Sequence, residues 1–140
     1  MKQSNKIFLR FGIFLLLLTA AAFAYCLQRE HIKKQNVTVL GSDAACEEWL
    51  RLHGWETADA ALTETVMPDK WQTEPGQNWL HLQHMQGFSP EDYAGKPVMI
   101  HTYTVRNAGT DCRAVLWLCE NELAGAYICR TDTQVMQSVF

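Results

Sequence analysis

Three runs rich in β-branched and aromatic residues follow one another in the second half of the chain and constrain its fold more than any other feature. They cover residues 97–107, 112–119 and 123–130, and only the short polar stretches AGTD and ENE separate them. Connections this short join antiparallel neighbours, because a parallel pair needs a crossover of a dozen or more residues. The sequence therefore predicts an antiparallel meander, and leaves open whether strands near residues 55 and 62 join it.

The stretch before the meander predicts a helix over residues 42–53. Ser42 or Asp43 can cap its start, and Gly54 can end it. The expected buried stripe follows helical spacing, and comprises Ala45, Trp49 and Leu52, with Leu50 beside them. Short strands are expected at residues 55–57 and 61–67.

A second helix is expected to begin near Gln77 and to end at Gly87. Pro75 and Gly76 form a strong breaker just before it. One or two helices followed by a meander predict an α+β fold in which the helices pack on an antiparallel sheet.

Residues 1–27 differ in composition from the rest of the chain. Three basic residues lie among the first ten, and Phe11 to Leu27 carries no charge. A helix of about 20 residues crosses a bilayer, so residues 8–27 predict a signal-anchor that spans the membrane once if Arg10 snorkels to the headgroups. Cleavage of a signal peptide near the small residues Ala22 and Ala24 is the alternative, and would make the protein secreted.

This segment sets the expected organisation. Residues 1–27 form the basic flank and anchor, residues 28–41 a juxtamembrane linker, and residues 42–140 an extracytoplasmic α+β domain at the cell membrane. Residues 28–140 contain nine Lys and Arg against fifteen Asp and Glu, a net charge of −6. Nucleic-acid binding depends on Lys and Arg contacts to phosphate, so an acidic domain of this kind excludes it.

Four of the five cysteines lie in the predicted domain, namely Cys46, Cys112, Cys119 and Cys129. None belongs to a Cys-x-x-Cys pair, so neither a zinc ribbon nor a thioredoxin-type site is indicated. Two interpretations stay open: disulfides, which persist outside the cell, and free thiols buried as small apolar residues.

Four stretches of the chain resemble the family called domain of unknown function 4830, found mainly in Gram-positive bacteria. They are EEWLRLHGWET (47–57), LQHMQGF (82–88), DYAGKPVMIHTYTVRN (92–107) and VLWLCENELAGAYICR (115–130), with similarity over roughly residues 44–131. The resemblance implies a membrane-anchored or secreted bacterial domain with no known activity. The sequence departs from the family at Glu74-Pro75-Gly76, which interrupts a usually helical stretch, and at Leu80, where Asn is common.

His81 and His84 are three residues apart on the second predicted helix, close enough for both to reach one metal ion. A zinc site needs at least three protein ligands, and the spacing of His53 and His101 does not single them out as partners. We therefore expect surface histidines, no metal and no cofactor. Helical geometry directs Trp79, Leu82 and Met85 to the apolar side, with Gln83 and Gln86 on or near it.

If the side-chain amides of Gln83 and Gln86 are buried, they must form hydrogen bonds. They are therefore expected to tie the helix to a strand edge or a turn, or else to line a ligand groove. Tyr93, Gly95 and Lys96 predict a tight turn, and most tryptophans predict core packing. The candidate interaction or ligand surface comprises Trp71, Trp79, Gln83, Gln86, Tyr93 and Tyr103.

The sequence contains no Gly-x-Ser-x-Gly elbow or phosphate-binding loop, and Cys112, Cys119 and Cys129 lie in predicted strands rather than at a helix N-terminus. We therefore expect a non-enzymatic domain that binds a protein or cell-envelope partner. A small-ligand or metal-binding module is the alternative.

Overall fold

The computed structural model describes residues 18–28, 37–109 and 111–140, which fall into two units, Met1–Val37 and Thr38–Phe140. In the first unit, residues 18–28 form a helix with exposed side chains. None of the helices in the described ranges is long and apolar enough to cross a membrane. The predicted anchor over residues 8–27 lies partly outside those ranges, because they do not include residues 8–17.

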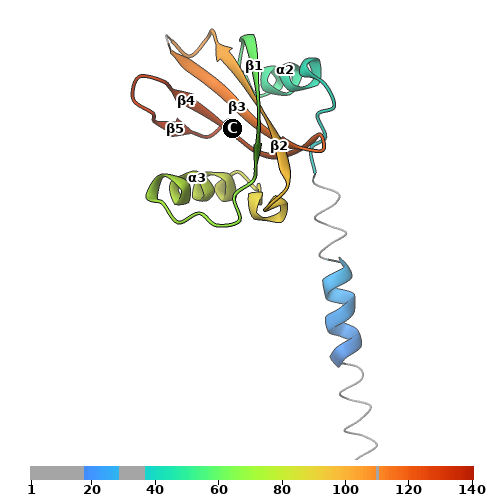
Figure 1. Cartoon of the computed structure of the whole chain (residues 1–140). Coiled ribbons are helices and arrows are strands. Elements are labelled where there is room, and N and C mark those ends of the chain that lie inside the picture. Colours follow the sequence, from blue (N-terminus) through green and yellow to red (C-terminus); the bar gives the residue numbers. More distant parts are fainter. Residues whose placement is uncertain (1–17, 29–36, 110) are drawn as a thin grey trace, which may run out of the picture. The chain divides into compact units, whose positions relative to one another are not determined.

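The second unit is a small α+β domain built on one five-stranded antiparallel sheet (Figure 1). Its strands lie side by side in chain order and are β1 (Thr57–Val66), β2 (Pro97–Val105), β3 (Cys112–Cys119), β4 (Glu122–Arg130) and β5 (Met136–Gln137). Its helices are α2 (Asp43–Leu52), α3 (Glu74–Met85) and the short 3-10 helix η1 (Pro90–Tyr93). The predicted meander is confirmed as β2–β3–β4, and β1 and β5 extend it on either side.

β1 is one long strand, so the prediction of separate strands at residues 55–57 and 61–67 is wrong. The register with β2 shifts between Ala58 and Ala60, and Asp59 adopts a φ of 47°. This bulge interrupts the alternation of side chains, while the backbone pairing continues on both sides of it. Because strands are predicted from alternating side chains, this interruption made one continuous strand look like two separate ones.

α2 confirms the predicted cap and stop. The Ser42 hydroxyl accepts a hydrogen bond from the Ala45 N–H at 3.2 Å, and Gly54 has a φ of 88°. The predicted stripe is confirmed in part: Leu50 is fully buried, and Ala45 and Trp49 pack against the larger core cluster. Leu52 was wrongly included, since it is 68% exposed, and the fully buried Cys46 was missed. Cys46 and Leu50 are four residues apart, so they lie on the side of the helix that faces the sheet. Cys46 fits there because its thiol packs as a small apolar group.

α3 begins three residues before the predicted start. Thr73 caps it by accepting a hydrogen bond from the Gly76 N–H at 3.3 Å, and Pro75 lies in the first turn. Proline is tolerated there because the first N–H groups of a helix have no partner within it. The predicted end is confirmed, since Gln86 caps the last turn and Gly87 has a φ of 86°.

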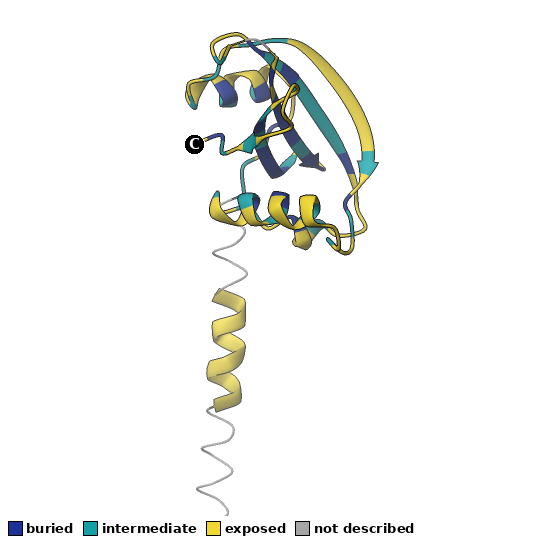
Figure 2. Ribbon diagram, turned by 90° about the vertical axis from the view of Figure 1, so that its left-hand side faces the viewer, coloured by how far each residue is buried: buried dark blue, intermediate teal, exposed yellow. Residues whose placement is uncertain are grey.

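The core consists of two clusters on the two faces of the sheet. The larger joins α2 to β2, β3 and β4, and the smaller gathers Met67, Val98, Cys119 and Ala124 under Trp71 and Tyr93. Figure 2 shows the buried residues concentrated in the middle strands, with β1 largely exposed. α2 and α3 lie at opposite ends of the sheet (Figures 1 and 2).

The domain begins before residue 42. Val39 forms a bridge with Glu122, and Leu40 is buried in the larger cluster. The predicted linker over residues 28–41 therefore extends too far, because residues 38–40 already pair with the start of β4.

Candidate functional site

Gln83 and Gln86 bind the edge of β4, as the first of the two interpretations expects. The Gln83 side-chain oxygen accepts from the Ala126 N–H at 2.8 Å, and the Gln86 amide donates to the Ala126 carbonyl at 2.9 Å. The Gln86 oxygen also accepts from the Val139 N–H at 2.8 Å. Together the two side chains replace a neighbouring strand at this point of the edge, so their amides hold the fold together.

Trp71 and Trp79 stack on each other, and Trp79 and Gln83 pack over Gly125 rather than on an open surface. Trp79 is 5% exposed, its ring stacks on Trp71 with centroids 4.6 Å apart, and it also contacts Trp117 at 5.0 Å. Gly125 permits this packing, because a Cβ there would lie 3.1 Å from the Gln83 oxygen and 3.2 Å from Trp79. Three predicted site residues therefore meet, as part of the core.

Tyr93 packs with Trp71 against the smaller core cluster, whereas Tyr103 belongs to the larger cluster on the other face of the sheet. The Tyr93 hydroxyl donates to Glu122 at 3.1 Å, and burial together with this carboxylate raises the pKa of Tyr93 to about 12. Tyr103 is fully buried in the larger core cluster, beside α2. The predicted surface is thus divided between the two faces of the sheet.

His53, His84 and His101 each contact a different partner. His84 pairs with Glu91 at 2.6 Å, His53 Nδ1 lies 2.7 Å from the Trp49 carbonyl oxygen, and His101 pairs with Asp43. No group of three or more His, Cys, Asp and Glu side chains in the described ranges could hold a metal ion.

All four domain cysteines are free thiols, which is the second of the two open interpretations. Cys46, Cys112 and Cys119 are buried, and burial raises the pKa of the Cys46 and Cys119 thiols. Among the described residues, none of these four thiols forms a hydrogen bond with a histidine. Cys46, Cys112 and Cys119 therefore pack as small core residues.

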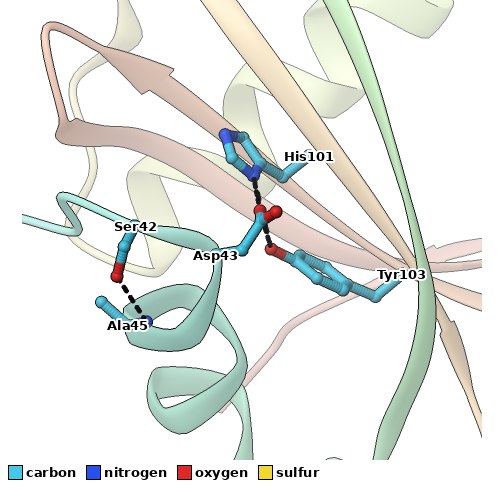
Figure 3. A network of polar contacts seen from close by, with 5 residues as sticks. All are labelled: Ser42, Asp43, Ala45, His101 and Tyr103. Carbon is cyan, nitrogen blue, oxygen red and sulfur yellow. Dashed lines mark hydrogen bonds and ion pairs between the residues drawn. The ribbon is translucent and has the colours of Figure 1, made fainter.

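A network that the sequence analysis did not single out joins α2 to β2 (Figure 3). His101 Nδ1 lies 3.0 Å from the Asp43 carboxylate, and the Tyr103 hydroxyl donates to the same oxygen at 3.1 Å. Burial, together with the neighbouring Cys46 and Asp43, raises the pKa of Tyr103. The carboxylate thus fixes the orientation of His101, whose other ring nitrogen points away from Asp43 (Figure 3).

His101 lines a groove of about 420 Å³ that opens beside this network. The groove runs along β1 and β2, on the face of the sheet that also holds α2. Its lining residues are Leu40, Gly41, Ser42, Leu62, Glu64, Pro97, Val98, Met99, His101, Leu118, Glu120 and Asn121. The alternation of β1 and β2 could have located it, because Leu62, Glu64, Met99 and His101 share one face.

The two edges of the sheet differ. Three segments cover the outer side of β4 in turn. They are residues 38–40, the side chains of Gln83 and Gln86, and β5. β1 pairs with β2 alone among the described strands, and six successive residues, Asp59–Glu64, are exposed. One edge of the sheet is therefore closed, and the other is open next to the groove.

The main-chain groups of β1 alternate between the sheet and the open edge. The Met67 N–H donates to the Lys96 carbonyl at 2.9 Å, which directs the main chain of Met67 toward the β2 side. Because an antiparallel ladder alternates, Thr65 and Thr63 also face β2, whereas Glu64 and Leu62 direct their N–H and C=O groups outward. The open edge thus presents hydrogen-bonding groups at the residues whose side chains line the groove.

Comparisons with known protein families, with curated proteins and with solved structures found no match for this chain.

Proposed function

We propose that the domain over residues 38–140 is a non-enzymatic binding module that captures an extended segment of a protein partner along the outer edge of β1. The observation that carries the proposal is the contrast between the two edges of the sheet. Exposed strand edges are templates for pairing with other chains, and native proteins usually cover or shorten them. Here β4 is closed by three different segments, whereas β1 is ten residues long and open.

The groove supports the same use of the edge. An added strand gains affinity from main-chain hydrogen bonds and specificity from pockets that receive alternate side chains. Leu62 and Glu64 supply both features, since their main chains face outward and their side chains line the groove. A strand bound at β1 would direct every second side chain into it.

The small-ligand alternative has less support. It needs a cavity between Gln83, Gln86 and the sheet tyrosines, but Gln83 is fully buried, and the Gln83 oxygen and the Gln86 nitrogen are both bonded to Ala126 of β4. A metal-binding role lacks support as well, because the part of the chain that the structure describes contains no cluster of metal ligands.

The proposal includes a membrane anchor over residues 8–27, with the domain on the extracytoplasmic side, or secretion after cleavage. It rests on the basic flank and the uncharged run, and the family resemblance stays a prediction. If the anchor operates, the full chain sediments with membranes after alkaline carbonate washing, and a chain starting at residue 28 does not. Recovery of both in the soluble fraction would contradict the anchor.

The test of the binding edge is photo-crosslinking in native membranes with a photoreactive side chain at position 62. We expect a crosslinked partner at position 62 and none with the same group at the exposed position Gln77 on α3. Leu62→Pro removes the outward N–H and should reduce partner capture, measured with the photoreactive group at Glu64, about tenfold. Leu62→Ala keeps the N–H and serves as the matched control.

Equal capture by the Leu62→Pro and Leu62→Ala variants would show that the edge does not bind the partner. Circular dichroism of both variants checks that the domain is folded before the comparison is made.

A further inference from the structure

We infer that the segment bound at β1 carries a lysine or arginine two residues away from an apolar residue. This inference rests on the proposed function and adds the chemistry of the partner. The groove combines an apolar lining with carboxylates that lack a cationic partner, and it lies beside the open edge.

The apolar part of the groove comes from three strands and the segment before α2. Leu62 of β1, Met99 of β2 and Leu118 of β3 all line it, and Leu62 is 54% exposed. Burying such a side chain under an apolar residue removes both surfaces from water, at roughly 25 cal/mol per Å². A partner residue opposite Leu62 is therefore expected to be apolar.

The charged part of the groove is acidic. Glu64 and Glu120 line it, and no Lys or Arg does. Both glutamates are exposed, and neither forms an ion pair or hydrogen bond with any residue in the described ranges. His101 is the one lining residue that can become cationic, and Asp43 holds it. The carboxylates of the groove are thus available to a cationic side chain of the partner.

The register of the sheet fixes where that cation lies. Glu64 is opposite Met99, and Met99 is opposite Leu118, so these three side chains form a row across the sheet. Leu62 lies opposite His101 in the next row on the same face. A directly opposed cross-strand pair has its Cβ atoms about 4.5–5.5 Å apart, so a partner residue opposite Glu64 is within ion-pair reach.

These two rows give the partner a sequence pattern. Residues that point to one face of a strand are two apart. An antiparallel partner therefore reads basic–x–apolar, and a parallel partner reads apolar–x–basic.

Two copies paired through their β1 strands do not fit the pattern. β1 has the sequence TADAALTETV, which contains no Lys or Arg. Pairing of two β1 strands would leave Glu64 without a cation, so the occupant is a segment other than β1.

The test uses heptapeptides of alternating valine and threonine, in which lysine replaces valine at the third position. The lysine and the remaining valines then share one face. Matched peptides carry Gln or Glu in place of Lys, and one places Lys at the fourth position, on the opposite face. Each is titrated into the ¹⁵N-labelled full chain in detergent micelles, following the amide signals of Leu62 and Glu64.

We expect the lysine peptide to bind about two- to fivefold more tightly than the glutamine peptide, as an exposed ion pair allows. The glutamate and shifted-lysine peptides should bind more weakly still. Glu64→Gln should abolish the preference for lysine over glutamine, and Glu74→Gln on α3 should leave it unchanged.

Equal affinity of the lysine, glutamine and glutamate peptides, with shifts at Leu62 and Glu64, would overturn the inferred basic residue and leave edge binding in place. An unchanged preference in the Glu64→Gln chain would also overturn it. If no peptide shifts the Leu62 and Glu64 signals at millimolar concentration, edge binding itself fails.

Discussion

At the scale of single residues, Gln86 joins more parts of the domain than any other polar side chain discussed above. Its amide donates to the Leu82 and Ala126 carbonyls, and its oxygen accepts from the Val139 N–H and the Ser138 hydroxyl. α3, β4 and the last residues of the chain therefore meet at one half-buried side chain. The loss of this side chain leaves main-chain groups without partners.

We expect Gln86→Ala to lower the free energy of unfolding by about 2–4 kcal/mol, since a buried main-chain group without a partner costs about 1–3 kcal/mol. Gln77→Ala on the exposed side of the same helix should change it by less than about 0.5 kcal/mol. Urea unfolding followed by tryptophan fluorescence measures both. A Gln86→Ala variant as stable as Gln77→Ala would contradict the role of Gln86.

Tyr93 predicts a loss of stability at high pH. An unfolded tyrosine has a pKa of about 10, whereas that of Tyr93 is raised to about 12. The folded state holds this proton longer than the unfolded state, so its contribution is complete below pH 10 and is lost as the pH rises toward 12.

The unfolding free energy of Tyr93→Phe should therefore decrease less than that of the unaltered chain between pH 9 and pH 11. Tyr103 contributes to the decrease in both proteins, so the difference between them isolates Tyr93. Parallel decreases would show that the Tyr93 hydroxyl is not shielded in the fold.

At the scale of secondary-structure elements, β1 is the long edge strand: it has ten residues and pairs with β2 alone among the described strands, whereas β5 at the other end of the sheet has two residues. The alternation of the main-chain groups of β1 makes neighbouring positions unequal. Thr63 faces β2, and Leu62 faces the open edge. Proline lacks an N–H, so it distinguishes these two directions.

Thr63→Pro should lower the free energy of unfolding by at least about 1–3 kcal/mol, because it leaves a carbonyl of β2 without its donor. Leu62→Pro should cost less than about 1 kcal/mol, because its N–H faces outward. Thermal unfolding of the two variants, compared at equal pH, measures the contrast. Equal losses would mean that the strand pairs on both sides.

At the scale of the whole domain, stability comes from two clusters on one sheet and not from covalent links. The cysteines are distributed over α2, β3 and β4, and all are free. Cys112 lies opposite Arg130, and Cys129 lies opposite Arg113, so these two neighbouring thiols point to opposite faces of the sheet. They cannot be linked without moving the backbone.

A maleimide reagent should label all five cysteines of the chain in denaturant without prior reduction. In the folded protein the buried thiols Cys46, Cys112 and Cys119 should react at least about a hundredfold more slowly than they do in denaturant, because labelling requires opening of the fold. Mass spectrometry counts the labels. Fewer than five labels on the denatured, unreduced chain would reveal a disulfide.

Part of the fold was predictable because it depends on local chemistry. The strands of the meander, the Ser42 cap and the Gly54 and Gly87 stops follow from alternation, capping and positive φ. The start of α3 was not predictable. Proline breaks a helix when it lies in the interior but fits when it lies in the first turn, and the sequence alone does not distinguish these two positions. The tie of Gln83 and Gln86 to a strand edge was foreseen as a type of contact, without its partner.

The sequence by itself determined the α+β class, the antiparallel meander of β2, β3 and β4 and the acidic character of the domain, because these depend on spacing and composition along the chain. Only the tertiary structure decided that Asp43, His101 and Tyr103 meet, that Glu64 and Glu120 share one groove, and that β1 is open while β4 is closed. The physical reason is distance along the chain. Asp43 and His101 are 58 residues apart, and the register of the whole sheet brings them together, a property that no local pattern encodes.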